Sequence, residues 1–408
     1  MNKYLAKRAY EVVSKSDILY IASLAKEDKK KGNRIINASI GSLLNDDKTL
    51  NGVGLIKDSL AEHIDDDLSY PPTTGQYEYK AAVLRWLLKD RYEEISSIKK
   101  IAIGATLGGT GACYVSMGTF LDKEQTVLLP DPMWGNYKQI AKKCFISYDT
   151  YSLFTKDGKF NLDSIKAKID EYKLKQDNIL IIVNDPCQNP TGFCMSKEEY
   201  DGLFDLLNEE SSTASITCLF DIAYIDCFTL GRKIHYVFTK SAEDNKFLPC
   251  FAFSCSKSFG AYGLRCGALI AMCSEEDTKK AVEASIGSLA RGTYSCPNGP
   301  ALHSIAKALS DSSTKEELSN QIEANSILLS KRCSRLLKAL DDNRIEHYPF
   351  TKGFFITIKV LDAFKLSEEL RSIHTYVVPI SATEIRIAVS SLNDEEIPVL
   401  VSQIKKLA

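Results

Sequence analysis

Short apolar runs alternate with longer amphipathic stretches between about residues 98 and 275. The stretches, such as LDSIKAKIDEYKLK, repeat apolar residues at helical spacing. The runs are rich in Val, Ile, Leu and Phe, as in strands buried on both faces. They read KKIAIGA, TVLLPD, ILIIVND, ITCLFD, FAFSCS and CGALIAMC. This alternation predicts the α/β class, with a mostly parallel sheet flanked by helices.

The pattern changes after about residue 275. A long helical stretch there precedes β-prone segments that are separated by the helix-like SEELRSIH; they read FFITIKV, TYVVPI and EIRIAV. Strands and helices mixed in this way are typical of an α+β region. We therefore expect a second, smaller α+β domain that includes the C-terminal part of the chain.

Chain length and net charge limit the number of domains and the class of partner that we expect. The chain has 408 residues, more than the roughly 250–300 at which a single hydrophobic core stops growing, so more than one domain is expected. Lys and Arg number 51 against 53 Asp and Glu, which leaves a formal net charge of -2. Near-neutrality argues against a polyanion as the main partner, so we expect no nucleic-acid binding.

Cysteines, histidines and apolar segments exclude several other classes of protein. None of the 12 cysteines forms a C-x-x-C pair and several lie in apolar runs, which is typical of free thiols in a reduced compartment. No two of the five histidines are close in sequence, so no metal site is expected. No apolar run approaches the ~20 residues that span a bilayer, and the charged N-terminal segment predicts no signal peptide. We expect a cytoplasmic protein without membrane contact.

The most informative strand end carries a lysine. Ligands of parallel sheets bind beyond the carboxyl ends of the strands, and Lys257 directly follows FAFSCS. An ammonium group is costly to bury, and lysines with a lowered pKa suit Schiff-base chemistry. Arg265 lies among glycines at 260, 263 and 267, and its planar guanidinium group suits paired hydrogen bonds to a phosphate. The alternative is a solvated lysine on a surface loop.

A glycine-rich segment, GATLGGTGA, follows the strand KKIAI and opens a helix. Free backbone N–H groups around Gly108, Gly109 and Thr110, together with the helix dipole, favour an anion and especially a phosphate. The segment lacks both the G-x-G-x-x-G spacing of dinucleotide sites and the G-K-[ST] of a P-loop. We therefore expect a single phosphate rather than a di- or triphosphate.

Three further strand ends carry candidate groups. Asp221 emerges from ITCLF and must find a cation or hydrogen-bond donors, unless it is only a helix N-cap. Asn189 opens an N-P-T-G segment that by itself could be only a turn. Trp134 either belongs to the core or stacks on a flat ring. With Tyr224, Lys257 and the phosphate segment, these groups match pyridoxal 5′-phosphate (PLP), which carries an aldehyde, a phosphate, a phenolic oxygen and a pyridine nitrogen.

In its motifs and their order, the chain resembles the fold-type I PLP-dependent aminotransferases over nearly its whole length, and in particular the aspartate/aromatic (class I) group. The similarity rests on INASIGSLLNDD, SYPPTTGQYEYK, GGTGA, P-x-W-x-N, NPTG, D-x-A-Y, S-x-S-K-x-F-G-x-Y-G-L-R-x-G, A-R-x-x-Y-S-x-P and R-I-x-V. The lysine segment is the most specific of these. The resemblance implies a large PLP-binding domain at 46–310 and a small domain formed by both chain ends, 1–45 and 311–408.

The resemblance also implies roles around the cofactor. Lys257 would form the internal aldimine and then move the proton between the substrate Cα and the cofactor. Asp221 would keep the pyridine nitrogen protonated. Asn189 and Tyr224 would bond the phenolic oxygen, and Trp134 would stack on the ring. The phosphate would be held by Gly109, Thr110, Ser254, Ser256 and Arg265, with Tyr70 from the neighbouring subunit.

The implied substrates are an L-amino acid and a 2-oxo acid such as 2-oxoglutarate. Arg386 in EIRIAV would bind the α-carboxylate together with Asn189 and Trp134, and Gly41 corresponds to a glycine of the substrate site. Arg291 aligns with the arginine that reaches across a homodimer to a side-chain carboxylate, which favours aspartate and glutamate. Aromatic substrates stay open, and the alternative for Arg291 is a solvated helical arginine.

The chain departs from the group's pattern in a few places. Gln188 stands where the aspartate enzymes usually have His, and Ala261 and 71–73 alter loops near the cofactor. These departures weaken the substrate assignment and leave the cofactor assignment intact. Two other functions stay open, namely a PLP-dependent carbon–sulfur β-lyase and a non-enzymatic PLP-sensing module, which the near-neutral charge disfavours.

Overall fold

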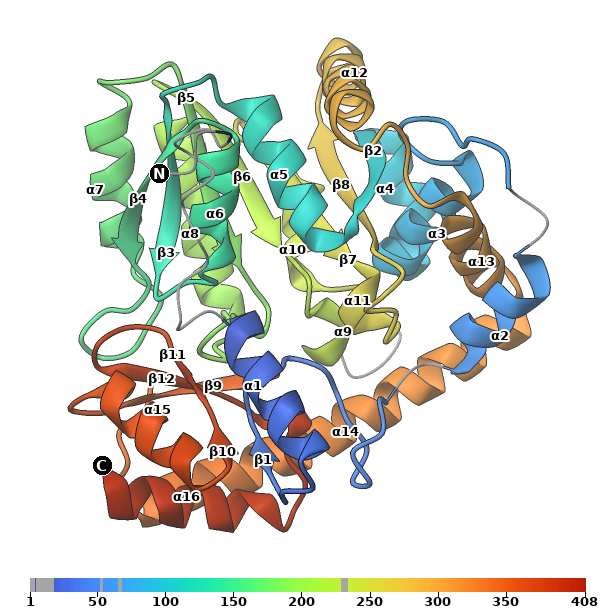
Figure 1. Ribbon diagram of the computed structural model, residues 1–408. Coiled ribbons are helices and arrows are strands. Elements are labelled where there is room, and N and C mark those ends of the chain that lie inside the picture. Colours follow the sequence, from blue (N-terminus) through green and yellow to red (C-terminus); the bar gives the residue numbers. More distant parts are fainter. Residues whose placement is uncertain (1–3, 5–17, 52–53, 65–67, 229–233) are drawn as a thin grey trace. The chain divides into compact units, whose positions relative to one another are not determined.

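The computed structural model describes residue 4 and residues 18–51, 54–64, 68–228 and 234–408 (Figure 1). The prediction of no signal peptide concerns residues 1–17, which lie outside the described residues except for Tyr4. The chain divides into two compact units. Unit 1 comprises Met1–Leu50, Lys331–Tyr348 and Phe354–Ala408, and unit 2 comprises Asn51–Ser330 and Pro349–Gly353.

A seven-stranded sheet forms the centre of unit 2 (Figure 1). Its strands are β2 (Lys100–Leu107), β3 (Thr126–Asp131), β4 (Ser147–Ser152), β5 (Asn178–Asn184), β6 (Ser215–Asp221), β7 (Leu248–Ser254) and β8 (Cys266–Cys273). They lie in the order β2-β8-β7-β6-β5-β3-β4. Only β8 is antiparallel to its neighbours, and the remaining strands run in one direction. The predicted mostly parallel sheet is confirmed.

Helices cover both faces of this sheet. One face carries α5 (Gly108–Phe120), α6 (Asn136–Lys143) and α12 (Glu276–Thr293). The other carries α3 (Tyr77–Leu88), α7 (Leu162–Tyr172), α8 (Lys197–Glu210), α10 (Tyr236–Ser241) and α13 (Gly299–Ser310). Unit 2 also contains α2 (Gly54–His63), the 3-10 helix η2 (Lys89–Arg91), α4 (Tyr92–Ile98), α9 (Ile225–Phe228), α11 (Cys255–Ser258) and the first part of α14 (Ser312–Asp342).

The strands of unit 2 are apolar at consecutive positions because each face needs its own core. In β5, Ile179, Ile181 and Val183 belong to one hydrophobic cluster, whereas Leu180 and Ile182 belong to the other. Successive side chains of a strand point to opposite faces, so a strand buried on both sides cannot alternate apolar with polar residues. This physical reason underlies the sequence pattern that predicted the sheet.

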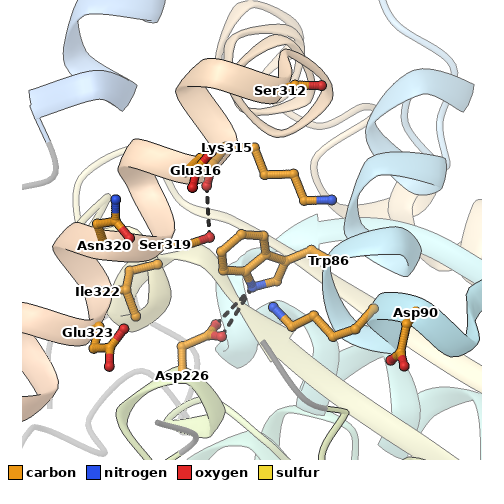
Figure 2. Close-up of a pocket in the computed structure, with 11 residues that line it drawn as sticks. Trp86, Asp90, Asp226, Ser312, Lys315, Glu316, Ser319, Asn320, Ile322 and Glu323 are labelled. Atoms are coloured by element: carbon orange, nitrogen blue, oxygen red, sulfur yellow. Dashed lines mark hydrogen bonds between the residues drawn. The ribbon is translucent and has the colours of Figure 1, made fainter. Parts of the chain in front are cut away.

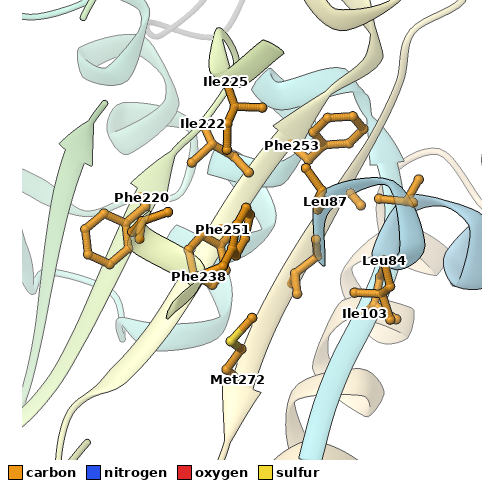
Figure 3. Packing of buried hydrophobic residues seen from close by; sticks show 14 of the residues in the cluster. Leu84, Leu87, Ile103, Phe220, Ile222, Ile225, Phe238, Phe251, Phe253 and Met272 are labelled. Carbon is orange, nitrogen blue, oxygen red and sulfur yellow. The ribbon is translucent and has the colours of Figure 1, made fainter. Parts of the chain in front are cut away.

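Aromatic rings fill much of the first cluster (Figure 3). Phe220 on β6 stacks on Phe251 of β7 with ring centroids 5.7 Å apart. Phe238 of α10 packs against Phe251 at 4.7 Å. Such pairs add stability beyond the area they bury, so β6 and β7 form a firm support for the residues at their carboxyl ends.

Unit 1 combines two small sheets with helices. β1 (Ile36–Asn37) pairs parallel with β10 (Thr375–Tyr376), and a three-stranded antiparallel sheet contains β11 (Val378–Pro379), β12 (Glu384–Ala388) and β9 (Phe355–Lys359). The helices are α1 (Ile18–Lys30), α15 (Ala363–Ser372), α16 (Glu396–Leu407), the 3-10 helix η3 (Val389–Ser391) and the last part of α14. The α+β character expected for the C-terminal part of the chain is present here.

One buried arginine ties separate segments of unit 1 together. Arg332 is fully buried and donates from Nη1 to the carbonyl oxygens of Leu44, at 2.8 Å, and Ser390, at 3.0 Å. Its Nη2 bonds the carboxylate of Asp46 at 2.8 Å. A buried charge needs such partners, so this residue holds both ends of the chain in one unit.

Along the chain, the boundaries between the units fall at 50/51, 330/331, 348/349 and 353/354. The functional domains at 46–310 and at 1–45 with 311–408 stay a prediction. The second boundary lies inside α14, which runs unbroken from Ser312 to Asp342. A continuous helix carries no proline, glycine or change of pattern at the boundary, so the sequence gives no local signal there. Among the described residues, no helix is both long and apolar enough to cross a bilayer.

Candidate active site

The strand pairing of unit 2 brings most of the predicted cofactor residues to one edge of the sheet. Asn184, the last residue of β5, pairs with Asp221, the last residue of β6. Ser254 ends β7 and pairs with Gly267. Leu107 ends β2 and pairs with Cys266. Segments at 108–110, 221–224, 254–257 and 265 therefore meet at the carboxyl end of the sheet, as predicted.

Arg265 and the first residues of α5 form a cradle for an anion. Arg265 Nη1 donates to Ser256 Oγ at 3.1 Å and to the carbonyl oxygen of Tyr262 at 3.0 Å. Gly108 has a φ of +70°, and a Cβ there would lie 2.7 Å from Arg265 Nη2. Only glycine therefore allows the guanidinium to approach the start of α5. A guanidinium beside the N–H groups of Gly109 and Thr110 fits a phosphate group.

Close packing fixes the two segments on either side of this cradle. Ser254 is the N-cap of α11, and its Oγ accepts a hydrogen bond from Ser256 N at 3.3 Å. A Cβ at Gly109 would lie 3.3 Å from Ser254 Cβ. A Cβ at Gly267 would lie 2.6 Å from the carbonyl carbon of Gly108. A larger residue at either glycine would push the two helix starts apart.

Asp221 is a buried carboxyl group with three donors around it. Oδ2 accepts from the Tyr137 hydroxyl at 2.5 Å and lies 3.8 Å from Cys113 Sγ, while Oδ1 accepts from Ala223 N at 3.2 Å. Burial raises the pKa of Asp221, and the bonds to Tyr137, Ala223 and Cys113 partly oppose that shift. Because a buried carboxylate gains from a cationic partner, this site suits the protonated nitrogen of a pyridine ring.

Lys257 projects from α11, directly after the strand that ends at Ser254. The lysine is half-buried, and its Nζ lies 4.8 Å from the ring centroid of Tyr262 and 5.8 Å from that of Tyr224. Tyr224 is itself buried. The Lys257 amine thus lies near two aromatic rings at the sheet edge and is partly shielded from solvent, unlike a lysine on a solvated loop.

Gln188 holds together the two loops that carry Asn189 and Trp134. Its Nε2 donates to the carbonyl oxygen of Pro132 at 2.8 Å, and its Oε1 accepts from Thr191 N at 2.9 Å and Thr191 Oγ1 at 2.6 Å. An amide can donate and accept at once, so it links the loop after β3 to the N-P-T-G turn. The departure from the expected His is therefore accommodated by this chain's own hydrogen bonds.

Backbone and ring contacts position Asn189 and Trp134 further. Asn189 N donates to Asn184 Oδ1 at 2.8 Å, and Asn184 Nδ2 donates to the carbonyl oxygen of Asp221 at 2.8 Å. The Trp134 ring meets the Tyr137 ring edge-on, with centroids 5.3 Å apart. Tyr137 thus contacts both Asp221 and Trp134 and couples the two predicted cofactor residues.

Two predicted substrate residues, Gly41 and Arg386, lie in unit 1. Arg386 on β12 is buried, its Nη2 donates to the carbonyl oxygen of Ser39 at 2.9 Å, and its guanidinium lies 4.1 Å from the Phe355 ring centroid. A Cβ at Gly41 would lie 2.3 Å from Phe355 Cζ. The ring of Phe355 therefore packs between them and requires the glycine.

The two residues expected to act across a subunit interface are exposed. Tyr70 is 92% exposed. Arg291 lies in the last turn of α12, where its Nη1 donates to Ser295 Oγ at 2.6 Å. Neither residue is buried among the cofactor residues of its own chain, as a role in a neighbouring subunit requires.

Sequence reasoning missed Tyr137, Cys113 and Asn184 as members of the site. Asn184 could have been found, since it is a polar residue at the last position of an apolar strand. Tyr137 stands three residues after Trp134, in the first turn of α6. Nothing in the sequence around Cys113, inside α5, distinguishes it from the other buried thiols.

The chain is similar in sequence and in structure to known aminotransferases. The family model for "Aminotransferase class I and II" matches residues 34–404. The mitochondrial aspartate aminotransferase of Saccharomyces cerevisiae is 26% identical over 287 residues, which span 62% of this chain and 61% of the yeast protein. The aromatic-amino-acid aminotransferase of Paracoccus denitrificans is 24% identical over 82% of this chain and 83% of its own. The crystal structure of an aminotransferase from Anaerococcus prevotii superposes with a TM-score of 0.89 at 29% identity, covering 99% and 98% of the two chains.

Proposed function

Because the chain belongs to the class I and II aminotransferases, we propose that it moves the amino group of an L-amino acid to a 2-oxo acid with PLP as its cofactor. The observation that carries the proposal is the convergence of three groups at one sheet edge. These groups are the anion cradle of Arg265 and α5, the buried carboxyl of Asp221 and the amine of Lys257. When bound, PLP supplies an electron sink for the negative charge that remains when a proton leaves the substrate Cα.

Different residues of unit 2 would hold different parts of the cofactor. Arg265, Ser254, Ser256, Gly109 and Thr110 bind its phosphate in the cradle described above. Asp221 would pair with the ring nitrogen and keep it protonated. Asn189 and Tyr224 would donate to the phenolic oxygen, and the ring of Trp134 would stack on the cofactor ring. Each of these roles is carried over from the family through the motif in which the residue lies.

Lys257 is the group that moves protons. Its amine would hold the cofactor through the aldehyde group, and Nζ would then serve as the base that takes the proton from the substrate Cα. The aromatic rings of Tyr224 and Tyr262 near Nζ limit access of water to the amine. A base that is held in place in this way accelerates proton transfer by roughly 10²–10⁴-fold.

For the substrate, we propose that Arg386 binds the α-carboxylate, together with Asn189 and Trp134, and that Gly41 leaves room beside it. The planar fork of arginine suits a bidentate pair with a carboxylate. Arg291 binds the side-chain carboxylate of aspartate or glutamate. Aromatic amino acids are further candidate substrates, since relatives with either specificity match this chain.

We also propose that the enzyme is a homodimer in the cytoplasm. Tyr70 reaches the phosphate of the neighbouring subunit's cofactor, and Arg291 reaches its substrate. The exposure of both residues in a single chain supports this arrangement. A tyrosine that is 92% exposed contributes little to the stability of its own chain. Contact with a neighbouring subunit would give its side chain a role.

Replacing Arg291 tests the substrate assignment. The variant Arg291→Ala is expected to lower kcat/KM for L-aspartate by roughly 10–100-fold, because one charge-assisted carboxylate contact contributes about 1.5–3 kcal/mol. L-tyrosine carries no side-chain carboxylate, so its kcat/KM should change little. Steady-state rates with both donors measure the difference. Equal losses for the two donors would remove Arg291 from the specificity argument.

Product analysis separates transamination from the carbon–sulfur β-lyase alternative. With L-aspartate and 2-oxoglutarate, an aminotransferase releases oxaloacetate and glutamate and no free ammonia. With L-cysteine or cystathionine, a β-lyase releases pyruvate and ammonia without needing a 2-oxo acid. We expect the first pattern. Ammonia release from the sulfur substrates as the main activity would overturn the proposed reaction while leaving the cofactor assignment in place.

A further inference from the structure

Unit 2 contains a cavity that shares no residue with the proposed cofactor site (Figure 2). Its volume is about 490 Å³, within the range of small-molecule sites. It is lined by residues from α3, η2, α9 and the first turns of α14, and its floor is formed by Trp86, Asp226 and Ile322. All three floor residues are buried.

Two half-buried ammonium groups enter this cavity. Lys89 and Lys315 both line it, and each side chain is half-buried. Lys89 Nζ lies 3.7 Å from the ring centroid of Trp86. Burial lowers the pKa of Lys89; the charge of Asp226 opposes this shift, and that of Lys315 adds to it. The two lysines are therefore close enough to act on the same ligand.

A buried carboxylate, that of Asp226, lies on the floor of the cavity beside Trp86. Trp86 Nε1 donates to both oxygens of Asp226, at 3.2 Å and 3.1 Å. The backbone of Lys89 has a φ of +52° and a ψ of -130°, which is costly for a residue with a side chain. The fold thus maintains a strained backbone at a position whose side chain points into a cavity beside another cation. The floor of the cavity thus holds one buried carboxylate for two ammonium groups, and a ligand carboxylate between the lysines would pair with both of them.

The rim of the cavity has the opposite charge. Asp90, Glu316 and Glu323 line it and are exposed. These carboxylates disfavour a ligand with several negative charges, such as a phosphate ester, and favour one that carries an ammonium group near its carboxylate. Ile322 and the indole of Trp86 add an apolar part to the floor.

We propose that this cavity binds a free α-amino acid with an apolar side chain. Its carboxylate lies between Lys89 and Lys315, its ammonium group faces the rim carboxylates, and its side chain rests on the floor. The site stands on its own residues and does not depend on the proposed catalytic function.

The floor of the cavity is continuous with the segments that carry Lys257 and Tyr224. The Trp86 ring meets the Phe259 ring edge-on, with centroids 5.4 Å apart, and Phe259 lies two residues after Lys257. Asp226 lies two residues after Tyr224. A ligand here therefore rests on groups that also support the proposed active site, which makes it a candidate regulator.

Tryptophan fluorescence tests the proposal because the chain has only two tryptophans. In the holoenzyme of Trp134→Phe, emission comes from Trp86 alone. Titration with L-leucine should change this emission saturably. The matched probes 4-methylpentanoate, which lacks the ammonium group, 3-methylbutylamine, which lacks the carboxylate, and inorganic phosphate should each require at least about tenfold higher concentrations.

Lysine variants on the same background complete the test. Lys89→Gln/Lys315→Gln should raise the L-leucine midpoint at least about tenfold, whereas Lys89→Arg/Lys315→Arg keeps both charges and should stay near the parent. The cofactor absorption band, followed in parallel, reports the proposed active site separately. An absent emission response, an unchanged midpoint in the glutamine variant, or equally tight binding of any matched probe would overturn the proposal.

Discussion

The variant Lys257→Ala is expected to lose transamination almost completely while still binding PLP. In the proposed function the lysine would supply both the covalent attachment and the base that takes the Cα proton, so kcat should fall by about 10⁴-fold or more, at or beyond the upper end of what a positioned base contributes. The cradle of Arg265, Ser256 and α5 does not involve the lysine, so the cofactor should remain bound through its phosphate. Steady-state rates and retention of PLP on gel filtration measure the two effects.

A matched lysine controls for the loss of charge. Lys100 is an exposed residue at the opposite end of β2, and Lys100→Ala should keep the parent rate. Adding a small primary amine to Lys257→Ala should restore part of the activity, because the amine can enter the space left by the side chain. A Lys257→Ala enzyme that retains more than about one hundredth of the parent kcat would contradict the assigned base.

The second large effect is expected for Asp221→Asn. The amide keeps the size and most hydrogen bonds of the carboxyl but carries no charge to hold a proton on the cofactor's ring nitrogen. Removal of a preorganised electrostatic contact of this kind costs roughly 10²–10³-fold in kcat. Burial raises the pKa of Asp221 and its three donors oppose that shift, so the carboxylate form depends on these donors and on the cationic ring.

Tyr137 gives a graded control for this prediction. Tyr137→Phe removes the 2.5 Å hydrogen bond to Asp221 and leaves those from Ala223 and Cys113. One hydrogen bond to a charged group contributes about 1.5–3 kcal/mol, so kcat should fall less than in Asp221→Asn. The pH profile of kcat should also shift, since the pKa of Asp221 rises when a donor is lost. A Tyr137→Phe enzyme with the parent rate and pH profile would show that this tyrosine has only a packing role.

Much of the fold follows from the pattern of apolar residues. The runs around Leu180 and Ile181 are apolar at consecutive positions because their strands are covered on both faces. That pattern predicted the mostly parallel sheet, and the polar residues that end its strands predicted Asp221, Lys257 and the Gly108–Thr110 segment. The resemblance to the aminotransferases, which those residues carried, is confirmed by the family match over 34–404.

Other features could not be predicted because they depend on contacts between distant segments. Tyr137 approaches Asp221 from α6, and only the stacking of that helix on the sheet brings the two together. Gln188 replaces an expected His, and the three-dimensional positions of Pro132 and Thr191 explain how it fits. The division of the chain inside α14 likewise has no local signal, since the helix continues unbroken.

The central claim is that the enzyme takes the amino group of its donor onto the cofactor. The most direct test mixes the holoenzyme with L-aspartate, L-tyrosine, L-kynurenine or L-alanine in turn, without any 2-oxo acid, and records the cofactor's absorption. At least one donor should shift the band to that of the amino form of the cofactor, and 2-oxoglutarate should reverse the shift. Absence of conversion with every donor would contradict the assignment as an aminotransferase.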